Sequence, residues 1–110
     1  MNKTIKSCIE DLNALVVSLK TISNDTEMGS GINFAIELAK QSINTRIQIL
    51  SDFIDEADTS NGICVEFIQS AIEVLDSSCS RQADDEYGLA FKSTMKTCMQ
   101  KLAEIRNKYS

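Results

Sequence analysis

The chain has 110 residues, of which 43% are hydrophobic and 25% are charged, and its formal net charge is −5. The apolar content is enough for one folded domain over residues 1–110 and too high for a disordered chain, while the length leaves no room for a second domain. The acidic excess argues against nucleic-acid binding, because affinity for the phosphate backbone comes largely from Lys and Arg, so we expect a protein partner.

The first segment of the chain predicts an amphipathic helix. Apolar residues recur at steps of three and four from Ile5 to Ile22, which is the period of one helical face. Lys6, Glu10 and Asp11 interrupt the segment, so it lacks the continuous apolar stretch of a signal peptide or a membrane-spanning helix. We therefore expect a cytoplasmic protein that does not contact a membrane.

Two glycines fall close together in the next stretch, which reads SNDTEMGSG. At the start of a helix they favour either a loop that cradles an anion or the turn of a helical hairpin. Phosphate loops usually carry a nearby basic residue, whereas Asp25 and Glu27 precede this one and would repel a phosphate. We therefore favour a hairpin turn over Gly29, Ser30 and Gly31, with Ser30 as the N-cap of the following helix.

The second helix is predicted to be long, about 25 residues, because apolar residues repeat from Ile32 to Ile54 without Gly or Pro. Ala35 is small enough to allow a close helix crossing. Large apolar residues also lie off the main seam, which indicates burial between neighbours or an oligomer contact. These additional residues are Phe34, Leu38, Ile49 and Phe53.

Arg46 lies beside the apolar seam of this second helix. One interpretation is structural, in which the side chain extends to the edge of the helix and pairs with an acid of a neighbouring helix. The alternative is a homo-oligomer that binds or sequesters a small anionic ligand such as a nucleotide. In that alternative Arg46, Lys40 and the turn at Gly29, Ser30 and Gly31 supply the site.

The remaining chain predicts two further helices. Apolar residues over 64–75 indicate a short third helix after a turn at Gly62, and the polar stretch SSCSRQADDEYG is then either a loop or a new helical start. Apolar residues over 87–109 form a last helical face. Gly88 costs that helix about 1 kcal/mol relative to Ala, so it marks a kink, a close crossing or the true start.

No segment shows the alternation of a strand, so the predicted fold is all-α. We expect an antiparallel bundle of about four helices, with a short third helix and no β-sheet, because short connections favour antiparallel neighbours.

Chemistry-bearing motifs are missing from the sequence. There is no histidine, which is the commonest general base and nitrogen ligand for metals. No two of the four cysteines form a Cys-x-x-Cys pair, so we expect buried free thiols and no metal site. Phosphate-loop and serine-nucleophile motifs do not occur. We therefore expect a protein that is not an enzyme, with no catalytic residue and no cofactor.

Charge is unevenly distributed along the chain. Residues 23–90 carry 13 acids against three bases, and residues 91–110 carry five bases against one acid. This pattern, with the additional apolar residues of the second helix, favours a non-enzymatic interaction protein. It would be an adaptor or inhibitor, of the kind that phages and mobile elements encode, docking on another protein with a basic surface. The candidate partner-binding residues are Asp52, Asp55, Glu56, Asp58, Phe34, Leu38 and Phe53.

Overall fold

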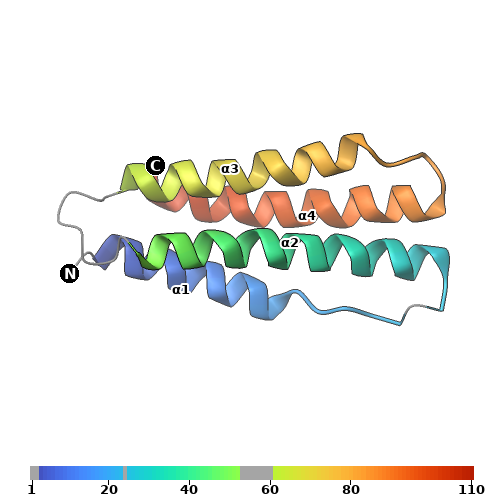
Figure 1. Ribbon diagram of the computed structural model, residues 1–110, viewed down its shortest axis with the longest axis horizontal. Helices are drawn as coiled ribbons and strands as arrows, with labels where there is room; N and C mark the ends of the chain where they lie inside the picture. The colour runs from blue at the N-terminus through green and yellow to red at the C-terminus, as the bar shows by residue number, and fades with distance from the viewer. Residues whose placement is uncertain (1–2, 24, 53–60) are drawn as a thin grey trace.

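The computed structural model describes residues 3–23, 25–52 and 61–110, with the side chains of residues 3, 4 and 61 excepted. These residues form four helices and no strand, and consecutive helices run in opposite directions (Figure 1). The predicted all-α bundle is therefore confirmed. The helices are α1 (Lys3–Ser18), α2 (Glu27–Ser51), α3 (Asn61–Ser80) and α4 (Glu86–Tyr109). The third helix has 20 residues, so the prediction that it is short was wrong.

The bundle is elongated and is built around a contact between α2 and α4. These two helices lie between α1 and α3 and run parallel to each other (Figure 1). They make the most extensive contact of any helix pair, whereas α1 and α3 make the least extensive one. The molecule accordingly measures 48 × 23 × 19 Å along its principal axes.

Small residues on one face of α2 make this contact possible. Gly31, Ala35 and Ala39 recur every four residues and are buried. A Cβ atom on Gly31 would lie 2.3 Å from the carbonyl oxygen of Tyr87, so the backbones of α2 and α4 touch at this point. The close helix crossing that Ala35 predicts is present, and Gly31 on the same face allows it.

The stretch with two glycines is helical, so the prediction of a hairpin turn at residues 29–31 was wrong. Thr26 is the N-cap of α2, because its Oγ1 accepts a hydrogen bond of 2.9 Å from the N–H of Gly29. Ser30 therefore does not cap the helix. Gly29 has an ordinary helical φ and is required for space, since its Cβ would lie 2.3 Å from the carbonyl oxygen of Ser23.

The first helix ends at Ser18, four residues earlier than the apolar pattern predicts. The following residues are not helical, and Asn33 of α2 holds Ile22 beside it. The N–H of Ile22 donates to Asn33 Oδ1 at 2.7 Å, and Asn33 Nδ2 donates to the carbonyl of Ile22 at 2.6 Å. This tertiary pair offers the backbone partners that a longer helix would otherwise supply.

The connection between α3 and α4 decides two alternatives that the sequence left open: whether SSCSRQADDEYG is a loop or a helical start, and what Gly88 marks. The serine-rich residues 76–80 continue α3, and α4 begins at Glu86. Asp85 is the N-cap, and its Oδ1 accepts a hydrogen bond of 2.7 Å from the N–H of Gly88. A Cβ on Gly88 would lie 1.8 Å from the carbonyl oxygen of Ala83. Gly88 therefore marks the start of the helix and a close approach of the preceding loop.

At the opposite end of the bundle, the last turn of α4 is fixed to α1. The Tyr109 hydroxyl donates to Asp11 Oδ2 at 2.7 Å and lies 2.8 Å from Ser7 Oγ, and Lys108 donates to Asp11 at 2.9 Å. Burial acts to raise the pKa of Asp11, but these two hydrogen bonds outweigh it and lower that pKa below its usual value. Burial raises the pKa of Tyr109. The four helices enclose one apolar core between these ends.

Candidate functional site

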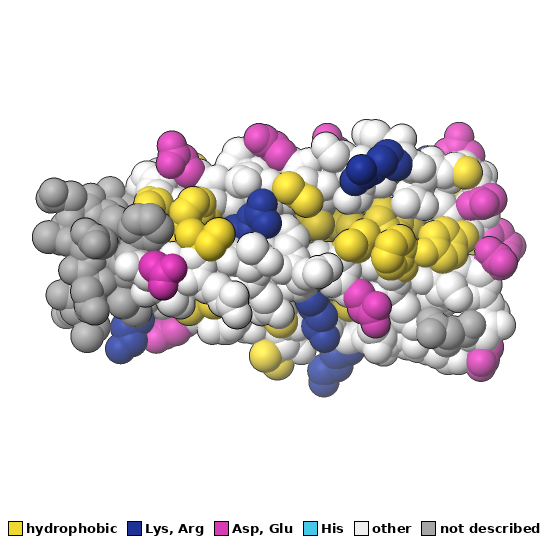
Figure 2. All heavy atoms as spheres, in the orientation of Figure 1, with side chains coloured by type: hydrophobic (Ala, Val, Ile, Leu, Met, Phe, Trp, Pro, Cys, Tyr) yellow, Lys and Arg dark blue, Asp and Glu magenta, His cyan; other side chains and the backbone are white. Residues whose placement is uncertain are grey.

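The seam between α2 and α3 carries exposed apolar side chains on both helices. Phe34 and Ile49 on α2 are 42% and 41% exposed, and Val74 on α3 is 44% exposed. Hydrophobic groups gather along this seam with a basic side chain between them (Figure 2). We call this surface the α2–α3 face; its members are Phe34, Leu38, Arg46, Ile49, Ser70 and Val74.

Helical spacing places the members of the α2–α3 face next to one another. Phe34 and Leu38 are four residues apart, as are Ser70 and Val74, and such pairs are neighbours on a helix surface. Leu38 and Val74 line one cavity of about 220 Å³ between the two helices, together with Arg46. The face thus combines a shallow hollow with apolar walls.

Arg46 joins α2 to α3 through serine oxygens. Its Nη1 donates to the carbonyl and the hydroxyl of Ser42 at 3.3 and 3.2 Å, and its Nη2 donates to Ser70 Oγ at 3.1 Å. Two ion pairs occur among the described residues, and neither includes Arg46. The prediction that it pairs with an acid of a neighbouring helix was therefore wrong. Since its acceptors are hydroxyl and carbonyl groups, no carboxylate among the described residues neutralises its positive charge.

Acidic side chains border the α2–α3 face. Glu37 and Asp52 on α2 and Glu66 and Glu73 on α3 are all exposed. Acidic groups are visible on both sides of the hydrophobic band (Figure 2). The predicted partner-binding residue Asp52 is the C-cap of α2 and lies at this border. The face therefore presents one cation at its centre and negative charge at its edges.

Four other predicted partner-binding residues lie outside the part of the chain that the structure describes. They are Phe53, Asp55, Glu56 and Asp58. Phe34 and Leu38 belong to the α2–α3 face, as described above.

Phe34 is held in place by two aromatic rings of α4. Its ring centroid lies 5.6 Å from that of Phe91, which is fully buried, and 6.4 Å from that of Tyr87. Burial raises the pKa of Tyr87, and the charge of Glu27 acts in the same direction. Phe34 is thus a surface aromatic side chain whose position is set by the core, which suits a binding surface.

The alternative anion site is not assembled. The N–H groups of Gly29 and Ser30, the third and fourth residues of α2, already donate to Thr26. Arg46 lies 15 residues beyond Gly31, about 22 Å along a helix at 1.5 Å per residue. Lys40 precedes Arg46 by six residues, which at 100° per residue places it on a different side of α2. The predicted ligand residues Gly29, Ser30, Gly31, Lys40 and Arg46 therefore do not form one pocket.

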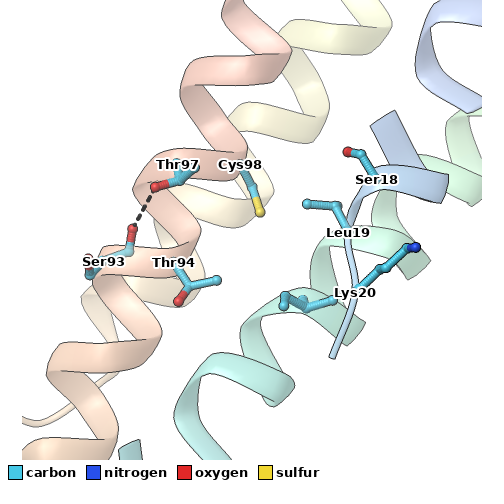
Figure 3. Close-up of a pocket in the computed structure, with 8 residues that line it drawn as sticks. Ser18, Leu19, Lys20, Ser93, Thr94, Thr97 and Cys98 are labelled. Carbon is cyan, nitrogen blue, oxygen red and sulfur yellow. Dashed lines mark hydrogen bonds between the residues drawn. The ribbon is translucent and has the colours of Figure 1, made fainter. Parts of the chain in front are cut away.

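A second concave surface follows α4 on the side of α1. Two cavities of about 310 and 350 Å³ share Ser93 and Thr94, and exposed Met28 and Leu89 border the second. We call this surface the α4 groove; its lining includes Leu19, Met28, Ile32, Leu89, Ser93, Thr94 and Cys98. It remains open because α1 ends at Ser18 while α2 and α4 continue. Lys20 borders the first cavity, but its ammonium group points away from α4 (Figure 3).

The described residues contain no cluster of three or more Cys, Asp or Glu side chains that could hold a metal ion. All four cysteines are free thiols. Burial raises the pKa of the Cys79 and Cys98 thiols, which lowers the fraction present as nucleophilic thiolate.

Comparison with known proteins gives no match to a family model, to a curated protein or to a solved structure. Within the described part of the chain, no helix is long and apolar enough to cross a membrane. The function is therefore inferred from the geometry of the two surfaces.

Proposed function

We propose that the protein is a non-enzymatic adaptor or inhibitor that binds an amphipathic helix of a partner protein on its α2–α3 face. The observation that carries this proposal is the Arg46 guanidinium, which among the described residues donates to uncharged oxygens alone and lies between exposed apolar side chains. Helices that dock in such seams present apolar anchors one turn apart. Arginine and aromatic side chains contribute the largest share of binding energy at many interfaces.

The chemistry of the face specifies the partner helix. A carboxylate at its centre would accept two parallel hydrogen bonds from Arg46, replacing the weaker bonds to serine. Apolar side chains one turn before and after that carboxylate would cover Leu38 with Val74 on one side and Ile49 on the other. Basic residues at the flanks would meet the acidic border, which agrees with the expectation of a partner with a basic surface.

The acidic residues Asp55, Glu56 and Asp58 extend this proposal as a prediction from the sequence. If they continue the acidic border beyond Asp52, reversal of all four charges to Lys weakens partner binding, mainly through a slower association rate. An unchanged association rate would show that these four residues do not belong to the interface.

The test starts by identifying the partner from the face itself. A photo-reactive benzoylphenylalanine at Val74 is expected to capture a partner in the native cells, and the same group at Leu89 in the α4 groove is the matched control. Both positions are exposed apolar residues, at 44% and 54%. Capture counts in favour only if the cross-linked peptide is a helix with a carboxylate between apolar residues.

A charge swap then tests the central contact. Arg46→Glu is expected to weaken binding of the captured partner at least 100-fold, because it places two carboxylates together. Changing the partner's central acid to Arg is expected to restore most of that affinity. If the swap does not restore binding, Arg46 does not contact the partner's carboxylate, and the proposal is contradicted.

A second function has one supporting observation, the cavity of about 220 Å³ that Arg46 lines with Ser42, Thr45 and Ser78. In this version a homo-oligomer binds a small anionic ligand there, such as a nucleotide. It predicts a mass above the monomer by light scattering and a rise in melting temperature with nucleotide or phosphate that Arg46→Ala removes. A monomer without a ligand-dependent shift would exclude it and leave the protein partner.

A further inference from the structure

The α4 groove continues the space that α1 occupies along the bundle. α1 packs against both α2 and α4, and it ends at Ser18. The two cavities of the groove begin at that point and follow α2 and α4 towards the end of the bundle at which both helices start. Beyond Ser18, residues 19–23 form a connection without helix (Figure 1). The groove is therefore the part of the α2–α4 pair that a longer α1 would cover.

The length of the groove matches a short helix. Its lining runs from Glu86 to Cys98 along α4 and from Met28 to Ile36 along α2. At 1.5 Å per residue these stretches are about 18 and 12 Å long, which a helix of roughly 8 to 12 residues spans. The wall on α4 includes Ala90, whose small side chain lets another helix approach closely.

The second cavity of the groove, of about 350 Å³, is mainly apolar. Met28 and Leu89 border it and are each 54% exposed, and the half-buried Ile32 lines it as well. Covering such side chains with another apolar group removes them from water and is favourable. The cavity therefore favours an occupant with apolar side chains one turn apart, which is the pattern that α1 itself presents to the core.

The charged groups of the groove favour a basic occupant. Lys20 and Glu86 are the charged residues in the lining of the two cavities. The ammonium group of Lys20 points away from α4 (Figure 3), so Glu86 is the charge that an occupant meets. Two ion pairs occur among the described residues, and neither includes Glu86. A Lys or Arg of the occupant would therefore find an exposed carboxylate at the end of an apolar hollow.

We propose that the α4 groove binds a basic amphipathic helix of a second partner protein, in the position beyond the end of α1. Apolar residues of that helix cover Met28, Ile32 and Leu89, and a Lys or Arg at one end pairs with Glu86. α1 and α3 lie on opposite sides of the α2–α4 pair, so the α4 groove and the α2–α3 face can be occupied together (Figure 1). This bridging role, which rests on the proposed function, makes the protein an adaptor rather than an inhibitor with one partner.

The test uses two stapled helical peptides of about ten residues, both with leucines one turn apart, and the whole protein. One peptide carries lysines in its end turn, and its twin carries glutamates there. The lysine peptide is expected to bind at least about tenfold more tightly, measured by fluorescence anisotropy at low ionic strength. Its largest amide chemical-shift changes should occur at Met28, Leu89 and Thr94. Equal affinities of the two peptides, or no binding of the lysine peptide, would overturn the proposal.

Matched variants assign the contacts of the lysine peptide. Glu86→Lys is expected to abolish its advantage over the twin, whereas Glu66→Lys, an equally exposed change on α3, should preserve it. Leu89→Ser is expected to weaken both peptides at least about fivefold, and Val74→Ser should weaken neither. All four positions are exposed, so the fold is retained in each variant. A preference for the lysine peptide that survives Glu86→Lys would contradict the role of this carboxylate and overturn the proposal.

The same peptides separate this inference from the proposed function. Arg46→Glu disrupts the α2–α3 face and is expected to leave the affinity for the lysine peptide unchanged. Chemical-shift changes centred on Arg46 and Val74 would place the peptide on the α2–α3 face and overturn binding in the α4 groove. That result would not affect the proposed binding of the first partner through Arg46.

Discussion

The α2–α3 face and the α4 groove are two apolar surfaces of one small bundle that differ in their charged groups. Both are hollowed, and both expose large apolar side chains, such as Val74 in the first and Leu89 in the second. Arg46 lies at the centre of the α2–α3 face, whereas the basic group beside the α4 groove, Lys20, points away from it. Apolar exposure alone therefore does not distinguish the two surfaces, and the placement of a cation gives only one of them a chemical preference.

Both surfaces follow from the contact between α2 and α4. Because these two helices touch, α1 and α3 pack on opposite sides of them, and each leaves part of the pair uncovered (Figure 1). The shorter α1, with 16 residues against 24 in α4, leaves the α4 groove open. On the other side α3 packs mainly on α4, and Arg46 of α2 reaches α3 through Ser70.

The largest expected effect on stability comes from the residue that brings α2 and α4 together. Gly31→Ala would place a Cβ 2.3 Å from the Tyr87 carbonyl and force the two backbones apart. We expect a loss of at least about 2 kcal/mol in the free energy of unfolding, measured by urea denaturation. Gly62→Ala is the matched control in α3, because no atom of the described residues lies within 4 Å of the added atom. It should stabilise the protein by about 0.5–1 kcal/mol, and equal effects of the two changes would refute the close contact.

A smaller effect is expected at the wall of the α4 groove. Asn33→Ala removes both hydrogen bonds to Ile22 and is expected to cost about 1.5 kcal/mol, because Asn33 is buried and forms these bonds across the fold. Amide hydrogen exchange of residues 19–23 should become faster, while Ser70 and Val74 keep their protection. Asn44→Ala, at an exposed position of the same helix, should change stability by less than about 0.5 kcal/mol. Unchanged exchange over residues 19–23 would mean that Asn33 does not hold this segment.

The link between α1 and the end of α4 predicts a pH dependence. The lowered pKa of Asp11 means that its contribution is fully present above pH about 4 and is lost as the pH falls further, when the folded protein must take up the proton. Asp11→Asn is expected to cost about 1 kcal/mol at pH 7 and almost nothing near pH 2, measured by urea denaturation at both values. Glu10→Gln is the exposed control and should show no such difference. A cost that is the same at both pH values would contradict the role of the carboxylate.

Arg46 should affect binding far more than stability. Arg46→Gln removes partly exposed hydrogen bonds to serine, so we expect a stability change of no more than about 0.5 kcal/mol. Affinity for the captured partner should fall at least tenfold by calorimetry. Lys40→Gln removes the same charge from another side of α2 and should leave the affinity unchanged. Equal losses of affinity in both variants would mean that Arg46 contributes only through the net charge of the protein.

The periodicity of the sequence was sufficient to predict the four helices, including the 25-residue length of α2. It failed where a tertiary contact decides the local structure. The end of α1 depends on Asn33, which lies 11 residues beyond Ile22. The two glycines near the start of α2 resemble a turn in the sequence. In the structure, Gly29 donates to the capping Thr26, and Gly31 leaves room for the backbone of α4 at Tyr87. Helical spacing cannot show that Asn33 contacts Ile22 or that Gly31 contacts Tyr87.

The same distinction holds for the candidate site. Phe34 and Leu38 were predicted because they lie off the apolar seam of one helix, which is a property of local spacing. Ser70 and Val74 were missed, since their relation to α2 depends on how α3 packs against it. Pairing between helices, rather than their formation, was the part that the sequence left undetermined.

The most direct test of the α2–α3 face is a map of amide chemical-shift changes in the isotope-labelled protein when the captured partner segment is added. We predict that the largest shift changes occur at Arg46, Ile49, Ser70 and Val74. The changes at Met28 and Leu89 should be no larger than those of residues far from both surfaces. A footprint centred on Met28 and Leu89 would place the partner in the α4 groove and contradict the proposed role of Arg46.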